Sequence, residues 1–145
     1  MKTQYFPNII ENPTDYYNEL VNIEWEEGIR SKRGFTRLGK SLNVGDCDLV
    51  DILIATTMSK LNLNYQVNYI YLNYYKDGTY YTPSHSHPGE IQLVLSFGAT
   101  RTLKVGSKEF KMNNGDAIIF GSAVHSVPKE LTDQGRISIA TFMSK

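Results

Sequence analysis

The chain contains three histidines, and all of them lie in two short segments of its C-terminal half. His85 and His87 belong to the segment HSH, and His125 belongs to AVHSV. Because side chains alternate along a strand, His85 and His87 would point to the same side, and a third imidazole from a neighbouring strand could complete one face of a coordination sphere. These three residues are therefore candidate ligands of iron(II). His-x-His alone is a weak signal, and the pair could equally be polar loop residues between Pro83 and Pro88.

Short strands are expected to position these histidines. After residue 65 the sequence consists of runs of Tyr, Ile, Val, Leu and Phe separated by turns that contain glycine, which is typical of an all-β unit. Gly106-Ser107 lies between two alternating runs and predicts a tight hairpin. Strands are expected near residues 67–75, 80–84, 91–97, 101–105, 108–112, 117–120 and 136–142, with a shorter stretch around His125.

Two helices are expected before residue 65. Asn12-Pro13 is a typical helix start and is followed by apolar residues at helical spacing. A second helix should begin at Asp48, where an acidic start precedes an apolar stripe that could pack against a sheet. Together these patterns predict a mainly β fold with flanking helices (α+β).

Length and composition fit one domain. A chain of 145 residues can bury one sizeable core, with a helical N-terminal flank (1–64) that includes a basic segment (30–40), and a β core (65–145). Lys plus Arg and Asp plus Glu number 15 each, so the overall charge favours neither nucleic acid nor membrane. Cys47 is the only cysteine, which excludes an intrachain disulfide. The first residues lack a signal-peptide pattern and no apolar run would span a bilayer, so we expect a cytoplasmic location.

Four segments of the β region share an order and spacing with a known family. They read NYYKDGTYYTPSHSHPGE from Asn73, then IQLVLSFGATRTL, NNGDAIIFGSAVHSVP and GRISIATF. In this combination the sequence resembles the AlkB-like family of iron(II)- and 2-oxoglutarate-dependent dioxygenases, over roughly residues 67–142. The resemblance implies a double-stranded β-helix (jelly roll) barrel that binds Fe(II), with 2-oxoglutarate and O2 as co-substrates and succinate and CO2 as co-products.

The resemblance also assigns roles to individual residues. His85 and His125 match metal ligands, and Arg136 matches the arginine that holds 2-oxoglutarate. A guanidinium suits this task because it can bind a carboxylate with two parallel hydrogen bonds. Asn73 and Tyr75, two positions apart on one strand, match the polar pair that hydrogen-bonds the co-substrate. Asn73 could instead form a turn at a strand end, and Tyr75 could simply pack in the core.

Two positions depart from the family pattern. His87 stands where the family has a metal-binding aspartate, and Phe142 stands where it has a second arginine. Three neutral imidazoles could still hold iron(II), but the site would carry one more positive charge than a site with a carboxylate. A degenerate, inactive relative is therefore an open alternative.

The basic segment indicates a substrate. RSKRGFTRLGK contains five cations and no acid, and this region helps to grip nucleic acid in AlkB-like enzymes. Arg33 and Arg37 could neutralise phosphates of a single strand, and Phe35 or Tyr81 could stack on an extruded base. The resemblance thus favours oxidative demethylation or hydroxylation of a nucleobase, with a protein side chain as a second substrate class. A solvated basic loop is the equally weighted alternative.

Two other function classes remain. Cupins place an HxH pair, a glutamate and a later histidine on a similar barrel, and His85, His87, Glu90 and His125 imitate that set, although the glutamate follows His87 too closely. A cupin would need neither Asn73-x-Tyr75 nor an arginine in its cavity. A catalytically degenerate relative that binds nucleic acid is the third class.

Overall fold

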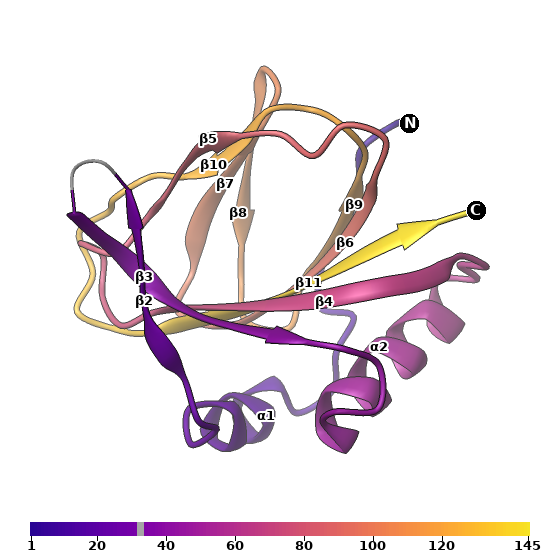
Figure 1. Cartoon of the computed structure of the whole chain (residues 1–145), viewed down its shortest axis with the longest axis horizontal. Coiled ribbons are helices and arrows are strands. Elements are labelled where there is room, and N and C mark those ends of the chain that lie inside the picture. Colours follow the sequence, from indigo (N-terminus) through magenta and orange to yellow (C-terminus); the bar gives the residue numbers. More distant parts are fainter. Residues whose placement is uncertain (32–33) are drawn as a thin grey trace.

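The computed structural model describes residues 1–31 and 34–145, and of residues 27–31 and 35 it describes the backbone alone. Within these residues it contains two helices and eleven strands (Figure 1). The elements are β1 (Gln4–Phe6), α1 (Pro13–Leu20), β2 (Glu26–Ser31), β3 (Gly34–Leu42), α2 (Asp48–Lys60), β4 (Gln66–Tyr75), β5 (Thr82–His85), β6 (Ile91–Gly98), β7 (Arg101–Val105), β8 (Lys108–Met112), β9 (Ala117–Phe120), β10 (His125–Val127) and β11 (Arg136–Ser144).

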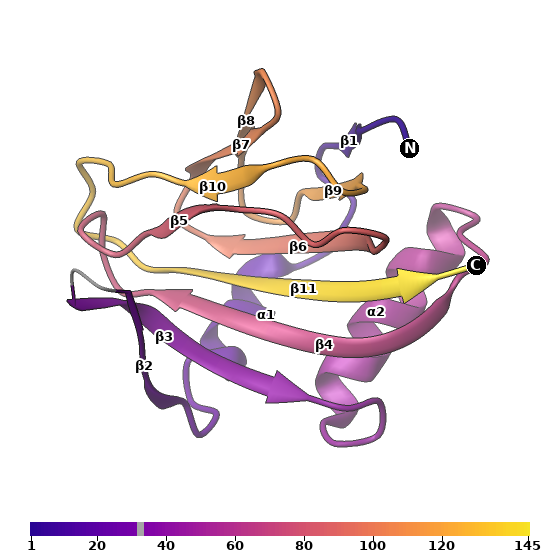
Figure 2. The ribbon, with the colours of Figure 1, turned by 45° about the horizontal axis from the view of Figure 1, so that its top comes forward.

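The strands form two antiparallel sheets that lie one above the other (Figure 2). The larger sheet has the order β1-β9-β6-β11-β4-β3-β2, and the smaller sheet has the order β5-β10-β7-β8. The last strand, β11, pairs with β4 on one side and with β6 on the other, so segments far apart in sequence become neighbours. Two sheets that wind around a shared interior in this way form a jelly roll, which confirms the expected double-stranded β-helix.

Alternation along the central strands separates two apolar clusters. On β11, Ile137 and Ile139 pack in one cluster with residues of both helices, whereas Ala140 and Phe142 belong to the second cluster, between the sheets. The helices lie against the outer face of the larger sheet (Figure 1). Burial of each large aliphatic side chain there contributes about 1.5–3 kcal/mol. Because this outer layer stabilises the sheet, the inner face can carry polar residues.

The expected elements agree with the structure over most of the chain. Both helices and all strands expected after residue 65 are present within one or two residues, and Gly106 takes a positive φ of 58° at the β7–β8 turn. The N-terminal flank differs, because it also carries β1, β2 and β3. Where the structure describes it, the basic segment therefore lies in strands: β2 is the edge strand of the larger sheet, and β3 pairs with β4 from Leu38↔Tyr74 to Leu42↔Ile70.

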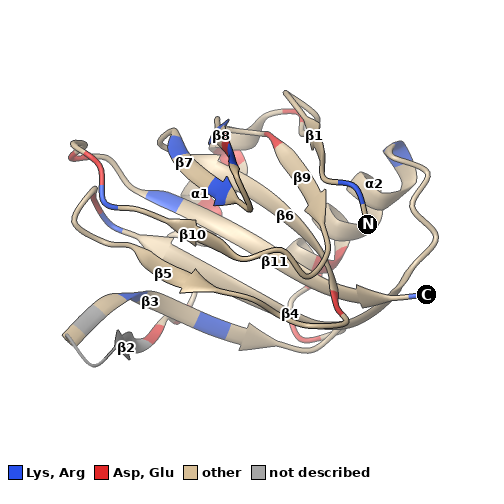
Figure 3. Cartoon of the chain, turned by 90° about the horizontal axis from the view of Figure 1, so that it is seen from above, with Lys and Arg blue, Asp and Glu red and all other residues tan. Residues whose placement is uncertain are grey.

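Charged residues of both signs are spread along the described chain, and Arg37 and Lys40 are the basic positions on β3 (Figure 3). This mixture agrees with the balanced composition. No helix among the described residues combines the length and the apolar character needed to cross a membrane.

Candidate metal centre

A cavity of about 270 Å³ opens between the two sheets. Its apolar wall includes Val94, Leu103 and Phe120 from β6, β7 and β9. Its polar wall includes His85, His87, His125, Asn73, Arg136, Ser138 and Arg37. The histidines and the arginine singled out in the sequence therefore line one cavity, although they are up to 51 positions apart.

The three histidines converge at this cavity. His85 ends β5 and His125 begins β10, and the two residues are direct partners in the antiparallel pair. Their ring centroids lie 4.2 Å apart, and the His87 ring lies 4.9 Å from His85 and 5.6 Å from His125. One ring nitrogen of each lies within 4.8 Å of the others. Since metal–imidazole bonds are about 2.0–2.1 Å long, small side-chain rotations would bring all three nitrogens onto one ion.

Backbone carbonyl groups orient two of the rings. The His85 Nδ1 lies 2.8 Å from the carbonyl oxygen of Pro83, and the His125 Nδ1 lies 3.0 Å from that of Ala123. A carbonyl oxygen can only accept, so each Nδ1 must carry the proton that is donated. The Nε2 atoms of His85 and His125 are thereby left with a free lone pair, as a metal ligand requires.

His87 reaches the cavity in a different way from the one predicted. Strand β5 ends at His85, so His85 and His87 do not share a face of one strand, and His87 lies in the loop that follows. Pro88 comes next and has no N–H to continue the pairing. The His87 ring nevertheless lines the cavity and contacts the edge or face of Phe142, with ring centroids 4.9 Å apart.

The cavity favours neutral imidazoles. Burial lowers the pKa of His125 to about 4, which the bond to the Ala123 carbonyl opposes and the nearby His85 and His87 reinforce. Burial also lowers the pKa of His87, with His85 as the next cause. Neutral imidazole is the form that binds metal, so at neutral pH protons compete weakly for these two candidate ligands.

Arg136 is the buried cation of the cavity. Only 1% of this residue is exposed, its Nε donates to the Ser96 Oγ at 2.8 Å, and its guanidinium carbon lies 5.4 Å from the centroid of the Tyr75 ring. Burial lowers its pKa from the usual arginine value, although an arginine remains protonated at neutral pH. Within the described residues no carboxylate is ion-paired with it. A buried cation without a paired anion suits an anionic ligand.

Asn73 and Tyr75 both line the cavity from β4, as their spacing predicts. The Tyr75 hydroxyl lies 2.6 Å from the Thr82 Oγ1. The Asn73 Oδ1 accepts a hydrogen bond of 2.6 Å from Arg37 Nε, and its Nδ2 donates to Ser138 Oγ at 3.4 Å. Arg37 thus connects the basic segment directly to the cavity.

The structure describes only part of the other residues predicted to bind substrate. Arg33 and the side chain of Phe35 lie outside what the structure describes. Tyr81 is half-buried beside the cavity, and it is not one of the cavity-lining residues. Its backbone N–H donates to the Thr36 carbonyl at 2.9 Å, and Lys129 Nζ lies 5.0 Å from the centroid of its ring.

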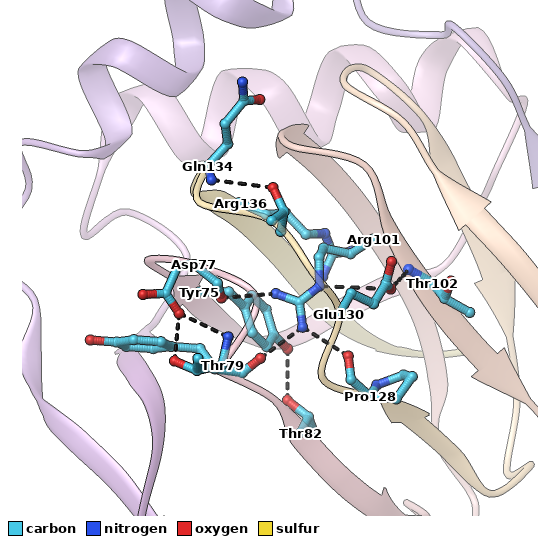
Figure 4. A network of polar contacts seen from close by, with 12 residues as sticks. Tyr75, Asp77, Thr79, Thr82, Arg101, Thr102, Pro128, Glu130, Gln134 and Arg136 are labelled. Carbon is cyan, nitrogen blue, oxygen red and sulfur yellow. Dashed lines mark hydrogen bonds and ion pairs between the residues drawn. The ribbon is translucent and has the colours of Figure 1, made fainter.

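Sequence reasoning missed Arg101, which is completely buried behind Tyr75 (Figure 4). Its guanidinium donates to the carbonyl oxygens of Asp77, Tyr80 and Pro128 at 3.2, 2.7 and 2.8 Å. These acceptors lie in the β4–β5 and β10–β11 connections, so Arg101 holds the loops beside the histidines. The only signal in the sequence was a charged residue at an inward position of a strand otherwise typical of a core.

Comparison with known proteins supports the fold. No protein-family model matches the sequence, and no curated protein matches it either. Among solved structures, the non-heme alpha ketoglutarate dependent epimerase SnoN from nogalamycin biosynthesis is 15% identical, with a TM-score of 0.73 over 99% of this chain and 77% of that one. SnoN has also been solved with Fe3+, alpha ketoglutarate and nogalamycin RO.

Two further structures represent different functions. A prolyl-4-hydroxylase from Pseudomonas putida is 14% identical, with a TM-score of 0.62 over 99% of this chain and 92% of that one. A predicted oxalate decarboxylase from Thermotoga maritima is 12% identical, with a TM-score of 0.57 over 86% of this chain and 96% of that one. At these identities the similarity establishes the shared jelly-roll fold, and the function has to be argued from the cavity.

Proposed function

We propose that this chain is an iron(II)- and 2-oxoglutarate-dependent oxygenase. The observation that carries the proposal is a single cavity lined by three converging imidazoles and by the buried cation Arg136. The similarity in fold to an epimerase that depends on alpha ketoglutarate, and to a prolyl hydroxylase, adds support.

The residues present fit both groups. His85 and His125 offer Nε2 atoms whose orientation is fixed by bonds from Nδ1 to backbone carbonyls, and His87 offers a third nitrogen. Three protein ligands leave positions open for a chelating keto acid and for dioxygen. An iron ion bound here would supply oxidation of a C–H bond by dioxygen, coupled to conversion of 2-oxoglutarate to succinate and CO2.

The protein's own part is to bind, orient and exclude water. Arg136 would hold the carboxylate of 2-oxoglutarate that is remote from the metal, while Asn73 and Tyr75 would donate or accept hydrogen bonds beside it. Val94, Leu103 and Phe120 give the cavity an apolar wall. Such a wall keeps water away from a reactive centre.

An anaerobic titration tests this proposal. The Fe(II)-loaded protein is titrated with 2-oxoglutarate while the visible charge-transfer band of a chelated keto acid is followed. We expect the band in the wild type and its loss in Arg136→Ala at the same 2-oxoglutarate concentration, with metal content unchanged. Stoichiometric iron without any band in the wild type would contradict an oxygenase.

Within this class we propose an AlkB-like enzyme that demethylates or hydroxylates a nucleobase. Support comes from the Asn73-x-Tyr75 pair in the cavity wall and from Arg37, which brings the basic segment to the same cavity. Succinate formation should be screened with methylated single-stranded oligonucleotides and with peptides. Turnover with peptides alone would overturn the nucleobase assignment, and salt-dependent oligonucleotide binding without succinate would indicate a degenerate relative.

A cupin-like metal protein is the second candidate, favoured by the similarity to a predicted oxalate decarboxylase. In a cupin-like site, Glu90 would join His85, His87 and His125 as a ligand. The Glu90 carboxylate instead accepts hydrogen bonds from Tyr69, outside the group of three converging ligands. This candidate would bind metal and give no keto-acid band.

A further inference from the structure

Four side chains form a closed ring of contacts that includes His87. The Tyr69 hydroxyl donates to both carboxylate oxygens of Glu90, at 2.8 and 3.1 Å. A Glu90 carboxylate oxygen lies 3.8 Å from the His87 Nδ1. The His87 ring packs against Phe142, and Phe142 stacks on Tyr69 with ring centroids 4.4 Å apart and an interplanar angle of 11°. Each of the four residues therefore contacts two others.

The larger sheet holds these four side chains in place. Tyr69 and Phe142 are direct partners on the adjacent strands β4 and β11, and Glu90 immediately precedes β6, on the other side of β11. Burial, together with Glu90, raises the pKa of Tyr69 to about 12, so its hydroxyl keeps its proton at neutral pH and remains a donor. Glu90 is thus held in place by a residue other than the histidine that it faces.

The position of the carboxylate matters for a metal at His87. A separation of 3.8 Å is too long for a hydrogen bond, so in this arrangement the contact between Glu90 and His87 is electrostatic. A carboxylate beside Nδ1 favours the proton on that nitrogen and leaves Nε2 for the ion. Outer carboxylates of this kind orient metal-binding imidazoles and raise their basicity. A small rotation of the His87 side chain would bring its Nδ1 within hydrogen-bond distance of Glu90, as such orientation requires. The carboxylate also brings negative charge near the ion, which three neutral imidazoles do not.

We propose that Glu90, held by Tyr69, is a positioning residue of the metal centre: it orients His87 and supplies from outside the ligand set the negative charge that three imidazoles lack. This inference rests on the proposed metal site. It adds to that site a carboxylate and a tyrosine that act through His87 and do not themselves contact the ion.

Metal affinity tests the inference without relying on turnover. Fe(II) binding is measured anaerobically by calorimetry for the wild type, Glu90→Gln, Tyr69→Phe and the double variant. We expect each single change to weaken Fe(II) binding about 10- to 100-fold. The double variant should bind Fe(II) about as tightly as the single variant with the lower affinity, because Tyr69 acts through Glu90. Glu109→Gln, which removes a carboxylate that is 65% exposed on β8, serves as the matched control and should bind like the wild type.

The outcomes separate this inference from the proposed function. A folded wild type that binds no stoichiometric Fe(II) would overturn both. A wild type that binds Fe(II), with Glu90→Gln and Tyr69→Phe equal to it and folded by circular dichroism, would overturn the positioning role alone. Abolished binding in Glu90→Gln with unaltered binding in Tyr69→Phe would also overturn it, since Glu90 would then be a direct ligand.

Discussion

Arg136 combines complete burial with a charge that no side chain in the described structure pairs directly. Its nearest partners are neutral: the Ser96 hydroxyl accepts from Nε, and the Tyr75 ring faces the guanidinium. Arg101, a second buried cation, faces the same ring at 5.1 Å and lowers the pKa of Arg136 further. A second cation on the same aromatic ring adds to the cost of burying the Arg136 guanidinium without a directly paired carboxylate. A bound dicarboxylate would offset that cost.

Replacing Arg136 should therefore affect 2-oxoglutarate binding and the stability of the ligand-free protein in different ways. We expect Arg136→Met to weaken 2-oxoglutarate binding by at least about 30-fold, because a buried charged partner of the carboxylate is lost. The stability of the ligand-free protein should stay equal or rise, since an apolar side chain of similar length replaces an unpaired buried charge. Calorimetry of 2-oxoglutarate binding and urea denaturation measure the two effects. Unchanged affinity would show that another residue binds the co-substrate.

At the scale of elements, Arg101 connects the loops around the metal centre. Besides its three bonds to carbonyl oxygens, it lies 3.7 Å from the Glu130 carboxylate, which in turn accepts from the Thr102 backbone N–H (Figure 4). The connections before β5 and after β10 are therefore tied to β7 by one side chain. The positions of His85 and His125 depend on these loops, because both histidines lie at the ends of short strands.

Removing the Arg101 side chain should destabilise the fold. We expect Arg101→Met to lower the free energy of unfolding by about 2–4 kcal/mol, because three buried carbonyl oxygens lose their donor. Lys104→Met, on the same strand but with a side chain 48% exposed, is the matched control and should change stability by less than about 0.5 kcal/mol. Urea denaturation measures both. Equal stability of the two variants would argue against a structural role for Arg101.

Gly78 allows close backbone contact between the same two loops, the β4–β5 and β10–β11 connections. Its N–H donates to the Thr132 carbonyl at 2.8 Å, and its carbonyl accepts from the Glu130 N–H at 2.9 Å. A Cβ at this position would lie 1.6 Å from the Glu130 carbonyl oxygen, so with any other residue at position 78 the two loops could not approach as closely as they do.

We therefore expect Gly78→Ala to lower the free energy of unfolding by more than about 3 kcal/mol. Gly45→Ala is the comparison for a glycine without a close contact, because a Cβ there meets nothing within 4 Å and its cost comes from the φ of 97° alone. It should cost only about 1–2 kcal/mol. Denaturation midpoints measured together would reveal the difference, and a Gly78→Ala variant no less stable than Gly45→Ala would contradict the close contact.

The strands that could be predicted from the sequence are those with a clear residue pattern. From β4 onward, runs of apolar and aromatic residues lie between turns that contain glycine, and this pattern predicted each strand. Strand β1 has only three residues, and β2 and β3 carry mostly charged and small residues. Strand β1 pairs with β9, β3 pairs with β4 and β2 pairs with β3, through backbone hydrogen bonds that leave no clear side-chain pattern in a sequence.

At the scale of the molecule, the site required the topology as well as the motifs. Residue type and spacing singled out His85 and His125, and the resemblance to AlkB-like dioxygenases singled out Arg136. Tyr69 and Glu90 were different, since tyrosine is common in this chain and Glu90 was considered only as a cupin-like ligand that follows His87 too closely. Only the placement of β4, β11 and β6 side by side brings the Tyr69 hydroxyl to the Glu90 carboxylate.

The buried imidazoles also give the stability of the metal-free protein a pH dependence. Burial lowers the pKa of His125 in the folded protein to about 4, whereas an unfolded chain has the ordinary value near 6.5. Between these values the unfolded state binds more protons than the folded state, so stability must fall as the pH decreases. The contribution is fully present above about pH 6.5 and is lost toward pH 4, with a size of roughly 2–3 kcal/mol.

Urea denaturation in the presence of a chelator at pH 7.5, 6.0 and 5.0 tests this dependence. The free energy of unfolding should fall progressively through this range, and the lowered pKa of His87 adds in the same direction. Carboxylates such as Asp77, whose pKa is lowered by its bonds to Thr79, affect stability mainly at more acidic pH. His125→Asn should therefore show a flatter profile between pH 7.5 and 5.0. Parallel profiles for the variant and the wild type would mean that His125 is protonated as readily in the folded protein as in the unfolded chain, and that the cavity does not keep this ligand neutral.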